Sequence, residues 1–174
     1  MKSMFKNSRK EKKLLQISSV SDITSNDNDL ATRSKFNFSY LDTSQSAGSD
    51  FKDLPKEILE DIFNKLREFG KKSLEELSRT PCGSGGSSGK RRCILEIYGS
   101  FPPAGKTRYI EPTYIPSQIQ WGRLRLSGLR RLAGFIIEPE YHGKEHPKSK
   151  QRFDKNTFYI VFLDMEHNFW VPTA

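Results

Sequence analysis

The sequence predicts an α+β fold with two layers, in which a helical hairpin packs on an antiparallel β-sheet. Three observations predict it: an alternating apolar segment near residue 36, an amphipathic segment over 54–69, and several strand-like segments between 92 and 171. Because the helical segments follow one another and most strand segments come later, we expect the helices on one face of the sheet. The 174 residues fit one such domain.

The first part of the chain differs in composition from the rest. Residues 20–33 are dominated by Ser, Asp, Asn and Thr, so they cannot bury enough apolar surface to offset the entropy of ordering. The prediction is therefore a disordered tail over 1–34, basic at its start, and a single folded domain over 35–174. Two segments of that domain are expected to be flexible loops, near 81–90 and 139–156.

The first predicted elements are a strand and two helices. Phe36, Phe38 and Tyr40 alternate with polar residues, which is typical of a half-buried strand. Apolar residues at helical spacing then predict a helix ending at Gly70. Its apolar stripe consists of Leu54, Ile58, Leu59, Ile62, Phe63, Leu66 and Phe69. Ser73 and Glu76 have the spacing of a capping box, which predicts a short second helix.

The rest of the domain is predicted to be sheet. Strand-like segments cover 92–98, 119–126, 129–137 and 157–163, and the second and third meet at a tight turn of Ser127 and Gly128. The segment 157–163 is the most apolar, so we expect it at the centre of the sheet. Residues 169–171 are expected to form a last short strand.

Charge and cysteine content limit the partners and the location. The net charge is +8, and residues 81–174 hold 14 basic and 8 acidic residues, which favours a polyanionic partner such as nucleic acid or an acidic protein. Cys82 and Cys93 are too few for a disulfide framework. No apolar run approaches the roughly 20 residues that span a bilayer. The expectation is a cytoplasmic protein without a membrane partner.

An arginine-rich segment is the strongest candidate for a nucleic-acid interface. In a strand, Arg123 and Arg125 share a face with Trp121. Guanidinium groups beside an indole ring suit phosphate contact together with base stacking. The candidate nucleic-acid-binding residues are Trp121, Arg123, Arg125, Arg130 and Arg131. The alternative is a solvated strand face whose arginines pair with acids.

The end of the most apolar strand carries a candidate acid–base group. Asp164 and His167 follow that strand, and a carboxylate with an imidazole can form an oriented proton donor or acceptor. Tyr159 adds a hydroxyl if it lies on the same side. The alternative is an ordinary turn with a surface histidine.

Two other patterns do not predict a site. His142 and His146, taken with Cys82 and Cys93, lack the ligand spacing of a zinc site. The Gly105-Lys106-Thr107 segment resembles the end of a phosphate-binding loop but lacks its first glycine and is followed by prolines. We therefore expect neither a metal nor a cofactor.

Three segments and the order of the elements carry a resemblance to a known family. The segments are Arg123-Leu124-Arg125-Leu126, Arg131-Leu132-Ala133-Gly134-Phe135-Ile136-Ile137 and 158–167. Together with the order of the elements, they resemble RelE/ParE-type bacterial toxins. The resemblance covers residues 36–174 in architecture and only this C-terminal stretch in residues. It implies a toxin that cleaves ribosome-bound RNA without a metal and is paired with an acidic antitoxin protein. The implied catalytic residues are Arg125 and Arg131, which stabilise charge together with Arg123, and His167 and Tyr159, which move protons.

A non-catalytic function remains open beside the enzyme. The same arginines would serve a basic binding module that holds nucleic acid or an acidic protein partner without chemistry. The two hypotheses differ at His167, because only the enzyme needs this imidazole within reach of a phosphate.

Overall fold

The computed structural model describes residues 23–25, 28–82 and 92–171. The chain divides into two units, Met1–Thr32 and Arg33–Ala174. Most of the predicted disordered tail and most of the predicted flexible loop near 81–90 lie outside the described residues. The few described residues of the first unit form turns, and the second unit contains the sheet and helices. None of the described helices is long and apolar enough to cross a bilayer.

The second unit contains one five-stranded sheet, in the order β1-β5-β4-β3-β2. The strands are β1 (Lys35–Asn37), β2 (Leu95–Gly99), β3 (Ile119–Arg125), β4 (Arg131–Ile137) and β5 (Thr157–Asp164). Strands β2 to β5 form an antiparallel meander, whereas β1 pairs with β5 in parallel. The sheet is therefore mixed and not purely antiparallel as predicted. The alternation of apolar and polar residues along one strand fits parallel and antiparallel pairing equally well, so it does not predict the direction in which β1 pairs.

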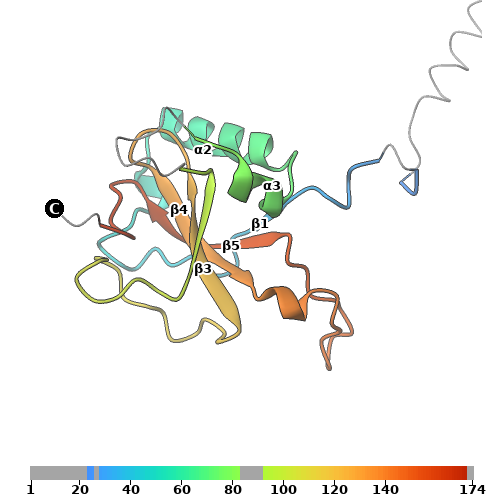
Figure 1. Ribbon diagram of the computed structural model, residues 1–174. Coiled ribbons are helices and arrows are strands. Elements are labelled where there is room, and N and C mark those ends of the chain that lie inside the picture. The colour runs from blue at the N-terminus through green and yellow to red at the C-terminus, as the bar shows by residue number, and fades with distance from the viewer. Residues whose placement is uncertain (1–22, 26–27, 83–91, 172–174) are drawn as a thin grey trace, which may run out of the picture. The chain divides into compact units, whose positions relative to one another are not determined.

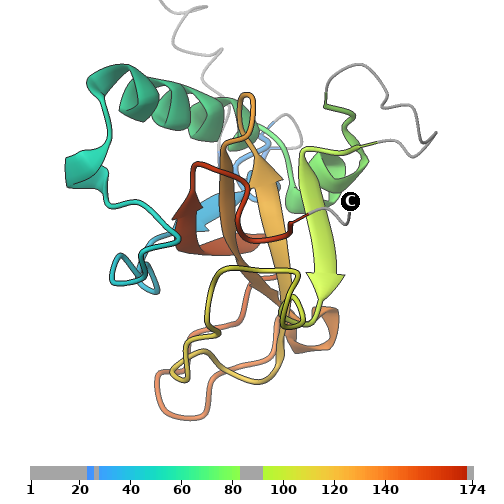
Figure 2. The ribbon, with the colours of Figure 1, turned by 90° about the vertical axis from the view of Figure 1, so that its left-hand side faces the viewer.

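Two α-helices follow β1 and a 3-10 turn. The 3-10 turn is η1 (Phe51–Asp53), and the two helices are α2 (Lys56–Phe69) and α3 (Leu74–Arg79). Pro55 precedes α2 without a side-chain cap, as expected for a residue that tolerates the first turn. The capping box of α3 is confirmed, since the Ser73 side chain accepts from the Glu76 backbone and Glu76 accepts from the Ser73 N–H at 2.7 Å. In Figures 1 and 2 both helices lie on one side of the sheet.

A mainly aliphatic cluster, called the aliphatic cluster below, lies between these helices and the sheet. Ile62, Leu66, Phe69, Leu74 and Leu77 come from the helices, and Leu95, Leu124, Leu132, Phe158, Ile160 and Leu163 come from the strands. Phe63 was predicted to join this stripe, but its side chain is 57% exposed. Phe63 lies at the margin of the stripe, beside the buried Ile62, and a side chain at that margin stays in solvent.

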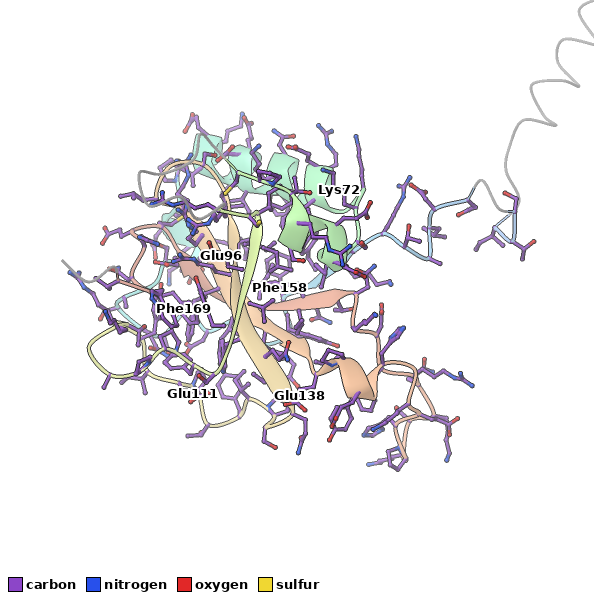
Figure 3. All side chains as sticks on the ribbon, viewed as in Figure 1. Lys72, Glu96, Glu111, Glu138, Phe158 and Phe169 are labelled. Carbon is purple, nitrogen blue, oxygen red and sulfur yellow. The ribbon has the colours of Figure 1, made fainter. Side chains whose placement is uncertain are left out.

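An aromatic cluster covers the opposite face of the sheet. Its fully or nearly fully buried members are Tyr109, Trp121, Ala133, Phe135, Val161, Phe162 and Phe169. Phe158 and Phe169, labelled in Figure 3, belong to the aliphatic and the aromatic cluster respectively. This face is covered by irregular connections in place of helices. Phe169, predicted to start a last strand, is instead a buried side chain in an irregular segment.

Strands β4 and β5 approach each other closely at Gly134. A Cβ atom there would lie 2.0 Å from the Tyr159 carbonyl oxygen, so only glycine fits. The pairing shifts register at the same point, between Ala133 and Gly134.

Strand β5 is interior but not central, because β1 and β4 flank it and β4 occupies the middle of the sheet. The segment 139–156, predicted as a flexible loop, contains η2 (Pro139–Tyr141) and a bridge between Glu145 and Arg152.

Candidate functional site

The candidate site lies on the aromatic face, at the end where β2, β3 and β4 bring charged side chains together. Glu96 of β2 (labelled in Figure 3) pairs in register with Arg123 of β3. The Glu96 carboxylate accepts from the Arg123 Nε at 3.0 Å and from an Arg125 terminal nitrogen at 2.5 Å. Arg131 of β4 pairs in register with Arg125 and with Asp164. Arg123, Arg125 and Arg131 are called the arginine cluster below.

The arginine cluster is buried. Arg123, Arg125 and Arg131 are 6%, 8% and 6% exposed. The sequence correctly places Arg123 and Arg125 on one face, and the structure shows that this face is buried at both residues. Buried guanidinium groups need charged partners, because an unpaired charge in a desolvated site is strongly unfavourable.

His167 contacts this cluster directly. Its Nε2 lies 2.6 Å from a terminal nitrogen of Arg123. Arginine only donates hydrogen bonds, so Nε2 accepts and the proton of the neutral ring is on Nδ1. His167 has a φ of 64°, a left-handed conformation within the turn after β5. Asp164 holds that turn by accepting from the backbone N–H groups of Asn168 at 2.7 Å and Phe169 at 3.0 Å.

The burial and the positive charges shift the ionisation of the site. Burial, followed by the charges of Arg123, Arg131 and Arg125, lowers the pKa of His167 to about 4. Burial raises the pKa of Glu96, but the hydrogen bond from Arg125 and the charges of both arginines outweigh it and bring the pKa below its usual value. At neutral pH the imidazole is therefore uncharged and Glu96 is ionised.

The cluster holds more positive than negative charge. Three guanidinium groups are accompanied by two carboxyl groups, Glu96 and Asp164, and burial raises the pKa of Asp164. Burial and the two neighbouring guanidinium groups lower the pKa of Arg131 to about 10. The buried Nε of Arg131 also has no hydrogen-bond partner among the described residues. A site with these properties attracts an anion.

Aromatic side chains extend the site outward. The Tyr98 hydroxyl donates to Glu96 at 3.0 Å, and burial raises its pKa. The Arg123 guanidinium lies 5.4 Å from the centre of the Tyr98 ring. On the same ring, Trp170 stacks with centroids 4.4 Å apart. Glu96, Tyr98 and Trp170 were not predicted, although Glu96 is the only acid in a strand-like segment next to the arginine-rich one.

Other predicted residues lie elsewhere. Trp121 is 1% exposed and its Nε1 donates to Glu111 at 2.9 Å, so its ring offers no free face for base stacking. Arg130 pairs with Asp61 of α2 at 3.0 Å. Tyr159 contacts Phe135 and Tyr40 in a separate cavity. The structure thus brings together Arg123, Arg125, Arg131 and His167, and separates Trp121, Arg130 and Tyr159 from them.

No metal centre is present in the described part of the chain, where no three His, Cys, Asp or Glu side chains gather. Cys82 Sγ contacts the Cys93 carbonyl at 3.3 Å, and His146 Nδ1 accepts from the Ser149 N–H at 3.1 Å.

Comparison of the chain with protein-family models, with curated proteins and with solved structures found no match.

Proposed function

We propose that this protein is a toxin that cleaves RNA without a metal, and that its active site is the arginine cluster with His167. The observation that carries the proposal is the contact between the uncharged His167 imidazole and Arg123, within a cluster that holds excess positive charge. A phosphodiester bound by these guanidinium groups would lie beside a group that can take up a proton.

The reaction would begin with the ribose 2′-hydroxyl. His167 takes its proton, the oxygen bonds to the adjacent phosphorus, and the bond from phosphorus to the 5′ oxygen breaks. The imidazolium then returns a proton to the leaving 5′ oxygen. The products are a 2′,3′-cyclic phosphate and a 5′-hydroxyl end. Arg123, Arg125 and Arg131 would stabilise the negative charge that accumulates on the phosphorane.

The low pKa of His167 is compatible with this role. The pKa is depressed by burial and by three positive charges, and a bound phosphodiester adds a negative charge beside the ring. Binding would therefore raise the pKa towards the working pH. It would also draw Arg123 away from Nε2 and free the lone pair that accepts the proton.

A second function, a non-catalytic module that binds RNA or an acidic protein, has its own support. Glu96 already accepts hydrogen bonds from Arg123, Arg125 and Tyr98, so this network is complete enough to be structural. In that case the cluster binds anions and His167 only orders the turn. An acidic antitoxin would occupy the same positive site under either function.

The test is incubation of purified full-length protein with message-bearing ribosomes, followed by sequencing of the cut ends, and a parallel incubation with ribosome-free RNA in a chelator tests the need for a metal. We expect cuts that end in a 2′,3′-cyclic phosphate, and slower growth of a bacterial host that expresses the protein. His167→Ala should reduce the cleavage rate by roughly 10²–10⁴-fold. Arg130→Ala is the matched control, because Arg130 pairs with α2 outside the cluster, and it should cleave normally.

The two functions give different results in this experiment. Folded protein that binds RNA, with a salt dependence typical of phosphate contacts, and that makes no cuts would support the binding module and exclude the ribonuclease. Cleavage that survives His167→Ala would remove His167 from the mechanism.

A further inference from the structure

A second cavity lies against β4 and β5, apart from the arginine cluster. Its volume is about 380 Å³, which is within the range of sites for small organic ligands. None of the arginine cluster and neither Glu96 nor His167 lines it. Its aromatic lining residues are Tyr40, Phe135, Tyr141, Phe153 and Tyr159.

The aromatic rings form flat walls at two angles. Phe135 and Tyr159 are nearly parallel, with an interplanar angle of 10° and centroids 5.0 Å apart. Tyr40 stands edge-on to both of them. Phe153 meets Tyr141 edge-on. Parallel and perpendicular rings around one cavity suit a planar aromatic ligand, which can stack on one wall and meet the edges of another.

Three polar groups accompany these rings. The Gln118 amide both donates and accepts, and within the described residues neither it nor the Tyr159 hydroxyl has a hydrogen-bond partner. His146 Nδ1 accepts from the Ser149 N–H, so the neutral ring carries its proton on Nε2 as a donor. Aromatic walls with a few donors and acceptors match a nucleobase, whose faces stack and whose edge forms hydrogen bonds.

An open cleft of about 610 Å³ adjoins the cavity and supplies positive charge. The two share His146, Phe153 and Tyr159 as lining residues. The cleft adds Lys35, which pairs with Asp154 at 2.6 Å, and Arg152. Arg152 is exposed and forms no ion pair with any described residue, so its guanidinium is available to a phosphate.

We propose that the cavity and the adjoining cleft form a nucleotide-binding site, with the base between the aromatic walls and the phosphate beside Arg152. The ligand chemistry is a nucleobase that carries a 5′ phosphate, supplied either by a free nucleotide or by a nucleotide within an RNA strand. The nucleotide-binding site uses no residue of the proposed active site, so its test does not depend on whether the protein cleaves RNA.

The test is calorimetric titration of the full chain with AMP, GMP, CMP and UMP, beside ribose 5-phosphate and inorganic phosphate. At least one nucleotide should bind, and ribose 5-phosphate and phosphate should bind at least fivefold more weakly. Phe153→Ala should weaken nucleotide binding roughly 5- to 100-fold, the range of a lost stacking contact. Phe63→Ala, the same change at an exposed ring on α2, should leave it unchanged.

Further measurements identify the source of the nucleotide and distinguish failure of this proposal from failure of the ribonuclease proposal. A short oligonucleotide that binds much more tightly than the mononucleotide assigns the site to RNA, and equal affinity assigns it to free nucleotides. Arg152→Ala should weaken the nucleotide but not the corresponding nucleoside. His167→Ala should bind mononucleotides as the wild type does, even if cleavage is lost.

Three outcomes would overturn the proposal. These are no binding of any of the four nucleotides at millimolar concentration, equal binding of ribose 5-phosphate, and unchanged nucleotide affinity of a folded Phe153→Ala protein. Phe153→Leu serves as a second variant, since it keeps the bulk of the side chain and the fold while it removes the aromatic face.

Discussion

The two faces of the sheet are built by different means. On one face, α2 and α3 bury aliphatic side chains that recur at helical spacing, so any residue of similar size and polarity would serve. On the other face, aromatic rings and a buried charge network depend on particular partners, such as Glu96 with Arg123 and Arg125. A periodic pattern therefore specifies the first face, whereas contacts between distant segments specify the second.

The comparison predicts the largest loss of stability at the charge network. Glu96→Gln leaves Arg123 and Arg125 buried without their common carboxylate, and breaking a buried ion pair costs about 3–5 kcal/mol. Urea unfolding of the variant measures this cost. The control is Glu60→Gln, because the exposed pair of Glu60 and Lys56 should contribute less than about 1 kcal/mol.

A small effect of Glu96→Gln would weaken the contrast between the two faces. It would indicate that the arginine cluster is solvated or neutralised by a bound anion, and dialysis against low-phosphate buffer would distinguish these cases.

The next largest effect tests the helical face with two neighbouring residues. Ile62→Ala removes a fully buried side chain and should lower the free energy of unfolding by about 2–4 kcal/mol. Phe63→Ala removes a larger but exposed ring and should change it by about 0.5 kcal/mol or less. Denaturant midpoints measure both variants, and equal losses would show that α2 is rotated from the orientation described above.

Near neutral pH the smallest expected effect is a dependence of stability on pH, because it develops only below about pH 6.5. The pKa of His167 is about 4 in the folded protein and about 6.5 when unfolded, so the unfolded state binds more protons between these values. Stability should therefore fall as the pH drops from about 6.5 towards 4. In His167→Gln this slope should be shallower, and in the exposed His146→Gln it should persist. Thermal unfolding at several pH values is the measurement, and identical slopes in all three proteins would contradict the burial of His167.

Local patterns in the sequence were sufficient for the helical face. The capping box at Ser73 and the stripe around Ile62 involve residues within one or two turns of each other, so spacing alone identifies them. Spacing did not resolve Phe63, because a side chain at the edge of a stripe is buried or exposed according to the neighbouring element.

The site could be predicted only in part. Alternation along β3 correctly put Arg123 and Arg125 on one face, since that depends on a single strand. The partner Glu96 lies in another strand, and the burial of Trp121 depends on distant aromatic residues such as Phe169. Tyr159 is on the aromatic face too, but it lies near the start of β5 and His167 follows the end of that strand, so the length of β5 separates them.

The parallel pairing of β1 with β5 has a consequence for the order of folding. Lys35, the first residue of β1, forms an ion pair with Asp154 just before β5, 119 residues later, and this edge of the sheet cannot close until both segments exist. Closing so long a loop carries a large entropic cost and raises the contact order, which slows folding. His167 follows β5 directly. During synthesis, the arginine cluster would therefore acquire its imidazole only after nearly all of the sheet had emerged from the ribosome.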